Sequence, residues 1–357
     1  MKKWWKQMVI LILVLSLMLP CFGMTVHATG GILSESERLL LVEALRDIEP
    51  QKATWGLSDI DFCDLCVGNP VQTYDYINNT LEPNRELYPI IANGQLVLWA
   101  IAHNGQYQLT NGLVKEVSNI ITNDTPFALL YDADCVYIYA NDTVTLLSKF
   151  AFTIDTRSTI VPESSLSDFE INTVSFGEGM LIGYRMTPRM SGNVWCYVDF
   201  VPQGNYRICW AATVACIYNY INNLEGSAAL DAVTVARREF GASFNKGIYW
   251  ENISGVLNAF DIDYVGASVA SLDPLNAADI HASVMNGYPA FGWFDALADE
   301  YHAVTIYGSN VLAGRMVVMD PNSGSHTVTL NANGDYSYVS NVTNDTYILL
   351  GAFYDCG

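Results

Sequence analysis

Positive charge is scarce in this sequence. Its 357 residues include 17 lysines and arginines against 37 aspartates and glutamates, which gives a formal net charge of −20 at pH 7. This balance argues against nucleic acid or anionic membrane as a partner, because both attract basic surfaces. Charged residues make up only 15% of the chain and hydrophobic residues 51%, so the sequence predicts a folded globular protein. The length suits two domains of ordinary size.

A second long apolar run is also missing after the N-terminus. Residues 1–28 have the parts of a secretory signal peptide: a basic start, the apolar run MVILILVLSLML and the small-residue site VHA. The basic residues are Lys2, Lys3 and Lys6. A membrane anchor is the alternative, but the run is short for a span, and Pro20 before Cys21 argues against a lipoprotein site. We expect cleavage after Ala28 and a secreted, extracellular chain, compatible with a Gram-positive bacterium.

Paired metal-binding motifs are absent as well. Of eight cysteines, seven follow the signal peptide, and an odd number in an exported chain predicts at least one free thiol. Cys63 and Cys66 form one C-x-x-C motif, but no second motif or histidine pair accompanies it, which argues against zinc. We expect these two to form a local disulfide or to be plain thiols. Cys196 and Cys356 are the candidates for a second disulfide. The sequence implies no metal and no cofactor.

Residues 29–153 predict an N-terminal α+β domain. Ser34 and Glu37 form a capping box before the apolar helix pattern RLLLVEALRDI. Further on, strand patterns alternate with turn signals, including Asn-Gly pairs that favour tight hairpins. These pairs are Asn93-Gly94, Asn104-Gly105 and Asn111-Gly112, and CVYIYANDTVTLLSKF predicts another hairpin. No catalytic group is evident here, and His103 is expected on a hairpin surface.

Residues 154–193 read as a linker, because serine, proline, glycine and glutamate recur there without periodicity. Residues 194–357 predict a second α+β domain, in which helices come first and an antiparallel sheet follows. A buried helix is expected from Cys209 to about Asn223, and two more in WENISGVLNAF and LNAADIHASVMNG. Five strand segments follow, with Asn333-Gly334 at one hairpin.

The second domain holds residues suited to nucleophilic catalysis. Cys209 is expected in the first turn of its helix, where unpaired N–H groups and the helix dipole favour the nucleophilic thiolate. His302 opens a strand, and Asp320 ends the next strand eighteen residues later, so pairing of the two strands brings imidazole and carboxylate together. Gln203, six residues before the cysteine, and the Cys209 N–H are candidate oxyanion donors.

The segments QGNYRICWAA, HAVTIYG and DP resemble the papain-like cysteine peptidases, most closely their bacterial branch, over roughly residues 195–357. The resemblance implies a papain-like fold that hydrolyses peptide bonds of a protein or peptide substrate through an acyl-enzyme thioester. It implies Cys209 as nucleophile, His302 as general base and acid, Asp320 as orienting residue and Gln203 as oxyanion donor. Many papain relatives use asparagine as the orienting residue, so Asn322 is the alternative to Asp320.

The resemblance also gives the first domain a role. Exported papain-like peptidases commonly carry a pro-region, so we expect a zymogen in which residues 29–153 inhibit the second domain until the linker is cut. Two other functions stay open. One is a peptidoglycan or leader-peptide amidase of the same superfamily, and the other is a non-enzymatic surface binding protein on a papain-like scaffold. Taken alone, Cys209 would be read as a core thiol, and His281 and His326 as ordinary surface or strand residues.

Overall fold

The N-terminal helix begins where its capping residues predict. In the computed structural model, α2 (Glu35–Ile48) follows Ser34, whose hydroxyl accepts the N–H of Glu37. The Glu37 carboxylate in turn accepts the N–H of Ser34 at 2.7 Å. These reciprocal bonds satisfy two of the donors that a helix start leaves unpaired, and they confirm the predicted capping box.

The structure describes residues 33–77, 80–122, 124–132, 135–149, 171–177, 179–184, 193–268, 276–296 and 300–357. The expected signal peptide and most of the expected linker lie outside these ranges. Over the residues described, no helix has the length and apolar character to cross a membrane.

The rest of residues 33–184, which we call the first half, is dominated by strands. They pair antiparallel, except that β2 and β6 run parallel. The strands are β1 (Cys66–Val67), β2 (Val71–Ile77), β3 (Thr80–Ala92), β4 (Gln95–His103), β5 (Gln106–Thr110), β6 (Phe127–Asp132), β7 (Cys135–Ala140), β8 (Thr143–Lys149) and β9 (Met180–Leu181). The short helical segments are η1 (Glu49–Gln51), η2 (Phe62–Asp64) and α3 (Val114–Ser118).

Two of the three Asn-Gly pairs in this half form the predicted hairpins. Asn93-Gly94 joins β3 to β4 and Asn104-Gly105 joins β4 to β5, each with positive φ at both residues. Asn141 and Asp142 turn the β7–β8 hairpin in the same way. The hairpin predicted at Asn111-Gly112 is wrong, because the chain passes there from β5 into α3 and Asn111 instead bonds Ser325 of the second half.

Four helices come first in residues 193–357, which we call the second half. They are α5 (Cys209–Ile221), α6 (Ala232–Phe240), α7 (Trp250–Ala259) and α8 (Ala277–Met285), with short turns η3 (Gly226–Ala228), η4 (Gly241–Ser243) and η5 (Val311–Ala313). Three of the four helices match the predicted ones. The sequence analysis missed α6, although Asp231 caps it by accepting the N–H of Thr234 at 2.6 Å.

Six antiparallel strands then close into a barrel. Each pairs with the next, and the last returns to the first. They are β12 (Ala290–Ala296), β13 (Glu300–Asn310), β14 (Arg315–Asp320), β15 (Gly324–Leu330), β16 (Tyr336–Val339) and β17 (Thr346–Tyr354). β10 (Val194–Trp195) extends the sheet beside β13, and β11 (Val265–Ser268) beside β17. One buried cluster takes side chains from all six barrel strands, as an interior requires.

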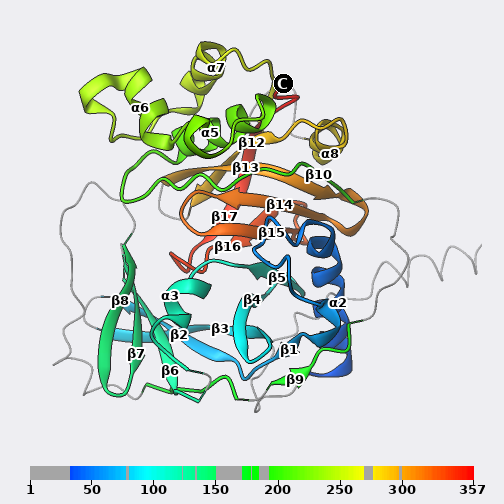
Figure 1. Ribbon diagram of the computed structural model, residues 1–357, viewed down its shortest axis with the longest axis vertical. Coiled ribbons are helices and arrows are strands. Elements are labelled where there is room, and N and C mark those ends of the chain that lie inside the picture. Colours follow the sequence, from blue (N-terminus) through cyan, green and yellow to red (C-terminus); the bar gives the residue numbers. More distant parts are fainter. Residues whose placement is uncertain are drawn as a thin grey trace, which may run out of the picture. The chain divides into compact units, whose positions relative to one another are not determined.

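The helices cover the outer side of two barrel strands. Buried residues of α5, α6 and α7 join Phe291, Trp293, Ala303 and Tyr307 of β12 and β13 in a second core. Figure 1 shows α5 and α8 beside these strands. The fold is thus a mixed α and β arrangement, as the sequence predicted. It sets the start of α5 against the end of β13 that carries His302.

Candidate active site

Cys209 lies at the first position of α5. Its neighbours along the helix are buried, whereas Cys209 itself is only partly buried. The ring N–H of Trp210 donates to the carbonyl of Lys246 at 3.0 Å, and the Thr213 hydroxyl donates to the carbonyl of Cys209 at 3.0 Å. These bonds hold the first turn in place. The backbone N–H of Cys209 belongs to the first-turn donors that lack an intrahelical acceptor, so it is available to a bound anion.

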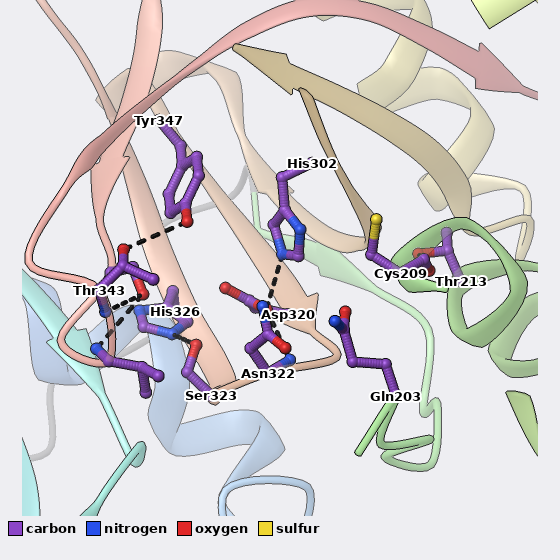
Figure 2. Close-up of polar contacts among 12 residues, drawn as sticks. Gln203, Cys209, Thr213, His302, Asp320, Asn322, Ser323, His326, Thr343 and Tyr347 are labelled. Atoms are coloured by element: carbon purple, nitrogen blue, oxygen red, sulfur yellow. Dashed lines mark hydrogen bonds and ion pairs between the residues drawn. The ribbon is translucent and has the colours of Figure 1, made fainter. Parts of the chain in front are cut away.

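His302 and Asp320 come from paired strands. Thr305 of β13 pairs with Met319 of β14, and both site residues lie beyond this pair on the same face of the sheet. The His302 Nε2 lies 2.8 Å from Asp320 Oδ1, and both side chains are fully buried. Figure 2 shows His302 between Asp320 and Cys209. Because Nε2 faces Asp320, the ring nitrogen left to serve Cys209 is Nδ1.

The carboxylate of Asp320 has three hydrogen-bond partners. Its Oδ1 accepts the backbone N–H of Asn322 at 2.8 Å as well as bonding His302, and its Oδ2 accepts the hydroxyl of Tyr338 at 3.0 Å. Burial alone would raise the pKa of Asp320. Attraction to His302 and the hydrogen bond to it, helped by His326 and the Asn322 N–H, instead lower this pKa below its ordinary value of 3.8.

The imidazole is shifted in the opposite direction. Burial alone would lower the pKa of His302, but its attraction and hydrogen bond to Asp320, and then its hydrogen bond and attraction to Cys209, raise that pKa above the ordinary 6.5. The other titratable groups near the ring are Tyr338 and Tyr347, whose pKa values burial raises further above 10.0. The site therefore favours a charged imidazolium between the Asp320 carboxylate and the Cys209 sulfur.

Gln203 is held next to this group. Its side chain is buried, and its Nε2 donates to the carbonyl of Tyr206 at 2.8 Å. Its backbone N–H donates to the carbonyl of Pro321, the residue after Asp320, at 3.2 Å. Figure 2 shows the amide end pointing toward the group formed by Cys209, His302 and Asp320. Since an amide nitrogen carries two hydrogens, one donor remains for an oxyanion beside Cys209.

The side chain beside the imidazole is that of Asp320 and not that of Asn322. The Asp320 side chain contacts the imidazole directly, whereas Asn322 contributes its backbone N–H to that carboxylate. The structure thus brings together the four residues chosen from the sequence, Gln203, Cys209, His302 and Asp320, and leaves the alternative in a supporting place.

Sequence reasoning missed the residues behind the carboxylate. Tyr338 and His326 are buried strand residues whose rings lie 5.0 Å apart, and the Tyr347 ring lies 5.3 Å from that of His302. The His326 Nε2 lies 2.6 Å from the Ser323 hydroxyl, and burial lowers the pKa of His326 to about 4. Period-two alternation in SHTVTL and YSYV places these side chains on one face of their strands, which is the signal that could have found them.

Two further histidines of the described residues lie outside the expected site, and each has a hydrogen-bond partner. His103 is half-buried, not a surface residue, and its Nε2 lies 3.1 Å from the hydroxyl of Ser337 in the second half. His281 Nδ1 lies 3.3 Å from the hydroxyl of Ser309. Neither of these two hydrogen bonds involves Cys209, His302 or Asp320.

The cysteines form no disulfide within the part of the chain that the structure describes. None of the seven cysteines from Cys63 to Cys356 is in a disulfide. The suggested pairing of Cys196 with Cys356 is wrong, because their thiols lie against the carbonyls of Val284 and Phe353 instead. Cys63 and Cys66 are plain thiols, the second of the two alternatives. No cluster of three potential metal ligands occurs among the described residues.

Comparison with known proteins does not place the chain in a family. No protein-family model matches the chain, and no curated protein sequence matches it.

Proposed function

We propose that this protein is a secreted cysteine peptidase with a papain-like catalytic arrangement. The observation that carries the proposal is the buried imidazole of His302, whose Nε2 lies 2.8 Å from Asp320 and which stands between Asp320 and Cys209 (Figure 2). A nucleophile, a base and an orienting carboxylate set side by side are what acyl transfer requires. The order of these residues along the chain and the helix-plus-barrel arrangement both support the resemblance to papain-like peptidases.

The first half of the reaction uses the thiol as nucleophile. The thiol proton resides on His302 Nδ1, so the imidazolium faces a Cys209 thiolate, and the sulfur attacks the carbonyl carbon of the substrate peptide bond. The carbonyl oxygen becomes an oxyanion, which the Cys209 N–H and the second Nε2 hydrogen of Gln203 stabilise. The C–N bond then breaks, the leaving amine receives the proton from His302, and a thioester remains on the enzyme.

The second half restores the enzyme. Water attacks the thioester carbon while His302 accepts one of its protons, and the C–S bond breaks to release a carboxylic acid. Asp320 stays ionised throughout. It fixes the orientation of the imidazole and stabilises its charged form, which both steps require.

Peptide hydrolysis by the purified chain tests this proposal. An unfolded protein substrate should be cut by the wild type. Cys209→Ser should abolish the cutting, because a hydroxyl gives up its proton to His302 much less readily than a thiol does and is therefore a poor nucleophile. Cys63→Ser is the matched control, since Cys63 is an exposed free thiol and its loss should leave the rate unchanged. Equal rates in the wild type and in Cys209→Ser would refute a cysteine peptidase.

A non-enzymatic binding protein is the alternative from a different class, and a peptidoglycan or leader-peptide amidase is the alternative within the superfamily. A binder would cut no substrate at all. An amidase would hydrolyse wall fragments or a leader peptide, but not the unfolded protein, in the same Cys209-dependent way.

The zymogen hypothesis stays a proposal as well. It holds that the first half restrains the second until the linker is cut. A specific protease site placed within residues 185–192 of the full chain provides the test, since cutting a zymogen there should release the first half and increase activity.

A further inference from the structure

The carboxylate of the proposed site lies at the start of a tight turn. Asp320 and Gly324 pair across the β14–β15 connection, which we call the carboxylate turn and which comprises residues 320–325. Asp320 is oriented by the Asn322 N–H, and so depends on the path of this turn as well as on its own strand. Whatever fixes the turn therefore fixes the carboxylate that faces His302.

Residues of the first half form hydrogen bonds directly with this turn. Asn111 Oδ1 accepts the N–H of Ser325 at 2.8 Å, and the Asn111 N–H donates to the carbonyl of Ser325 at 3.4 Å. One residue earlier, Thr110 pairs with His326 in the β5–β15 ladder, and its hydroxyl lies 3.3 Å from His326 Nε2. His326 in turn bonds Ser323 inside the turn, and Figure 2 shows both residues beside Asp320.

The fit between the two segments leaves no room for an added methyl group. A Cβ on Gly112 would lie 2.6 Å from the Ser323 carbonyl and 2.5 Å from Asn341 Oδ1. A Cβ on Gly324 would lie 2.5 Å from Asn111 Oδ1. The Asn341 amide also donates to the Gly112 carbonyl at 2.6 Å, so the contact is bonded as well as close.

These contacts lie on the Asp320 side of the site, whereas Cys209 remains partly exposed at the start of α5. An inhibitory segment works by covering the nucleophile or the substrate-binding surface. The contacts of residues 110–112 do something else, because they reach the site through the residues that orient its carboxylate.

We propose that Thr110, Asn111 and Gly112 are positioning residues, which hold the carboxylate turn so that Asp320 stays against His302. This inference rests on the proposed function. It makes the first half a permanent part of the catalytic unit and not a removable inhibitor. The first half and the second would then form one enzyme even after the linker is cut.

Two substitutions in the full-length mature chain test the proposal. Asn111→Ala removes the acceptor of the Ser325 N–H, and Gly112→Ala pushes a methyl group against the Ser323 carbonyl. Each should lower kcat by about tenfold to a hundredfold with little change in KM, because a small displacement of the orienting group misaligns the imidazole. The pKa of His302 should also fall toward its ordinary value, so the alkaline limb of the activity profile should move to lower pH.

Matched controls separate positioning from general stability. Asn84→Ala removes surface hydrogen bonds in the same half, and Gly255→Ala adds a methyl group where nothing lies within 4 Å. Both should keep the wild-type kcat and pH profile. If the wild type is active and all four variants behave alike, the positioning role is refuted while the peptidase proposal stands. If the wild type is inactive on every substrate, the proposed function itself has failed, and the NMR titration of His302 still reports whether Asn111→Ala lowers its pKa.

Cutting the chain provides a measurement that needs no destabilising variant. With the engineered protease site within residues 185–192, the two cut halves should elute together in gel filtration and keep the activity of the uncut chain. Separation of the halves with a rise in activity would overturn the positioning role and support the zymogen hypothesis.

Discussion

Tyr338→Phe gives a quantitative test of how the buried carboxylate is held. The Tyr338 hydroxyl donates to Asp320 Oδ2 at 3.0 Å, and both side chains are fully buried. A hydrogen bond to a charged group contributes about 1.5–3 kcal/mol to stability. Because the low pKa of Asp320 keeps it ionised near neutral pH, the lost donor leaves a charged oxygen poorly solvated in the interior. We therefore expect a loss in the upper part of this range.

The assay is urea unfolding near neutral pH, with the free energy extrapolated to water. Tyr336→Phe is the matched control, since Tyr336 lies two residues away on the same strand and is half-buried. That control should change stability by less than about 0.5 kcal/mol. If Tyr338→Phe is no more destabilising than Tyr336→Phe, the carboxylate does not depend on this donor and our reasoning about the site is wrong.

Three further predictions concern stability. Because the pKa of His302 is raised and that of Asp320 is lowered, their pairing stabilises the fold fully between pH 3.8 and 6.5, and this stabilisation is lost as pH rises through the folded pKa of His302. Urea unfolding from pH 6.5 upward should show a decline that Asp320→Asn removes. Asp47→Ala should cost about 3 kcal/mol in the same assay, since it removes the carboxylate 2.7 Å from buried Arg315 and leaves, among the described residues, only Glu43, at 3.6 Å, as an ion-pair partner, and a loss below about 1 kcal/mol would refute this. Ser34→Ala should cost about 1 kcal/mol by removing the α2 cap, and no change would mean that the cap is not needed.

The grouping of Cys209, His302 and Asp320 was predictable because each of them belongs to a local sequence pattern. Cys209 precedes a run that is apolar at helical spacing, and His302 and Asp320 each sit at the end of a period-two strand. A hairpin between those strands fixes the distance of the two side chains within narrow limits. The start of α5 had only to be packed against that hairpin, which the apolar face of the helix ensures.

The contacts that hold the turn after Asp320 in place could not be predicted in the same way. Asn111-Gly112 has the sequence of a hairpin turn, but its partner is a strand more than two hundred residues away. Local preference favoured the hairpin, and tertiary contacts with Ser323 and Asn341 decided otherwise. Likewise, α6 was missed because it is short and carries charged residues in its last turn, so its apolar stripe is narrow.

The alkylation rate of Cys209 by iodoacetamide, measured by peptide mapping, tests the central claim most directly. Exposed Cys63 in the same molecule is the internal reference. Our account predicts that Cys209 reacts faster than Cys63 although it is more buried, and that His302→Ala removes this advantage without changing the rate at Cys63. Equal or slower reaction at Cys209 in the wild type, or an unchanged rate in His302→Ala, would contradict the thiol–imidazole pair on which the proposed chemistry depends.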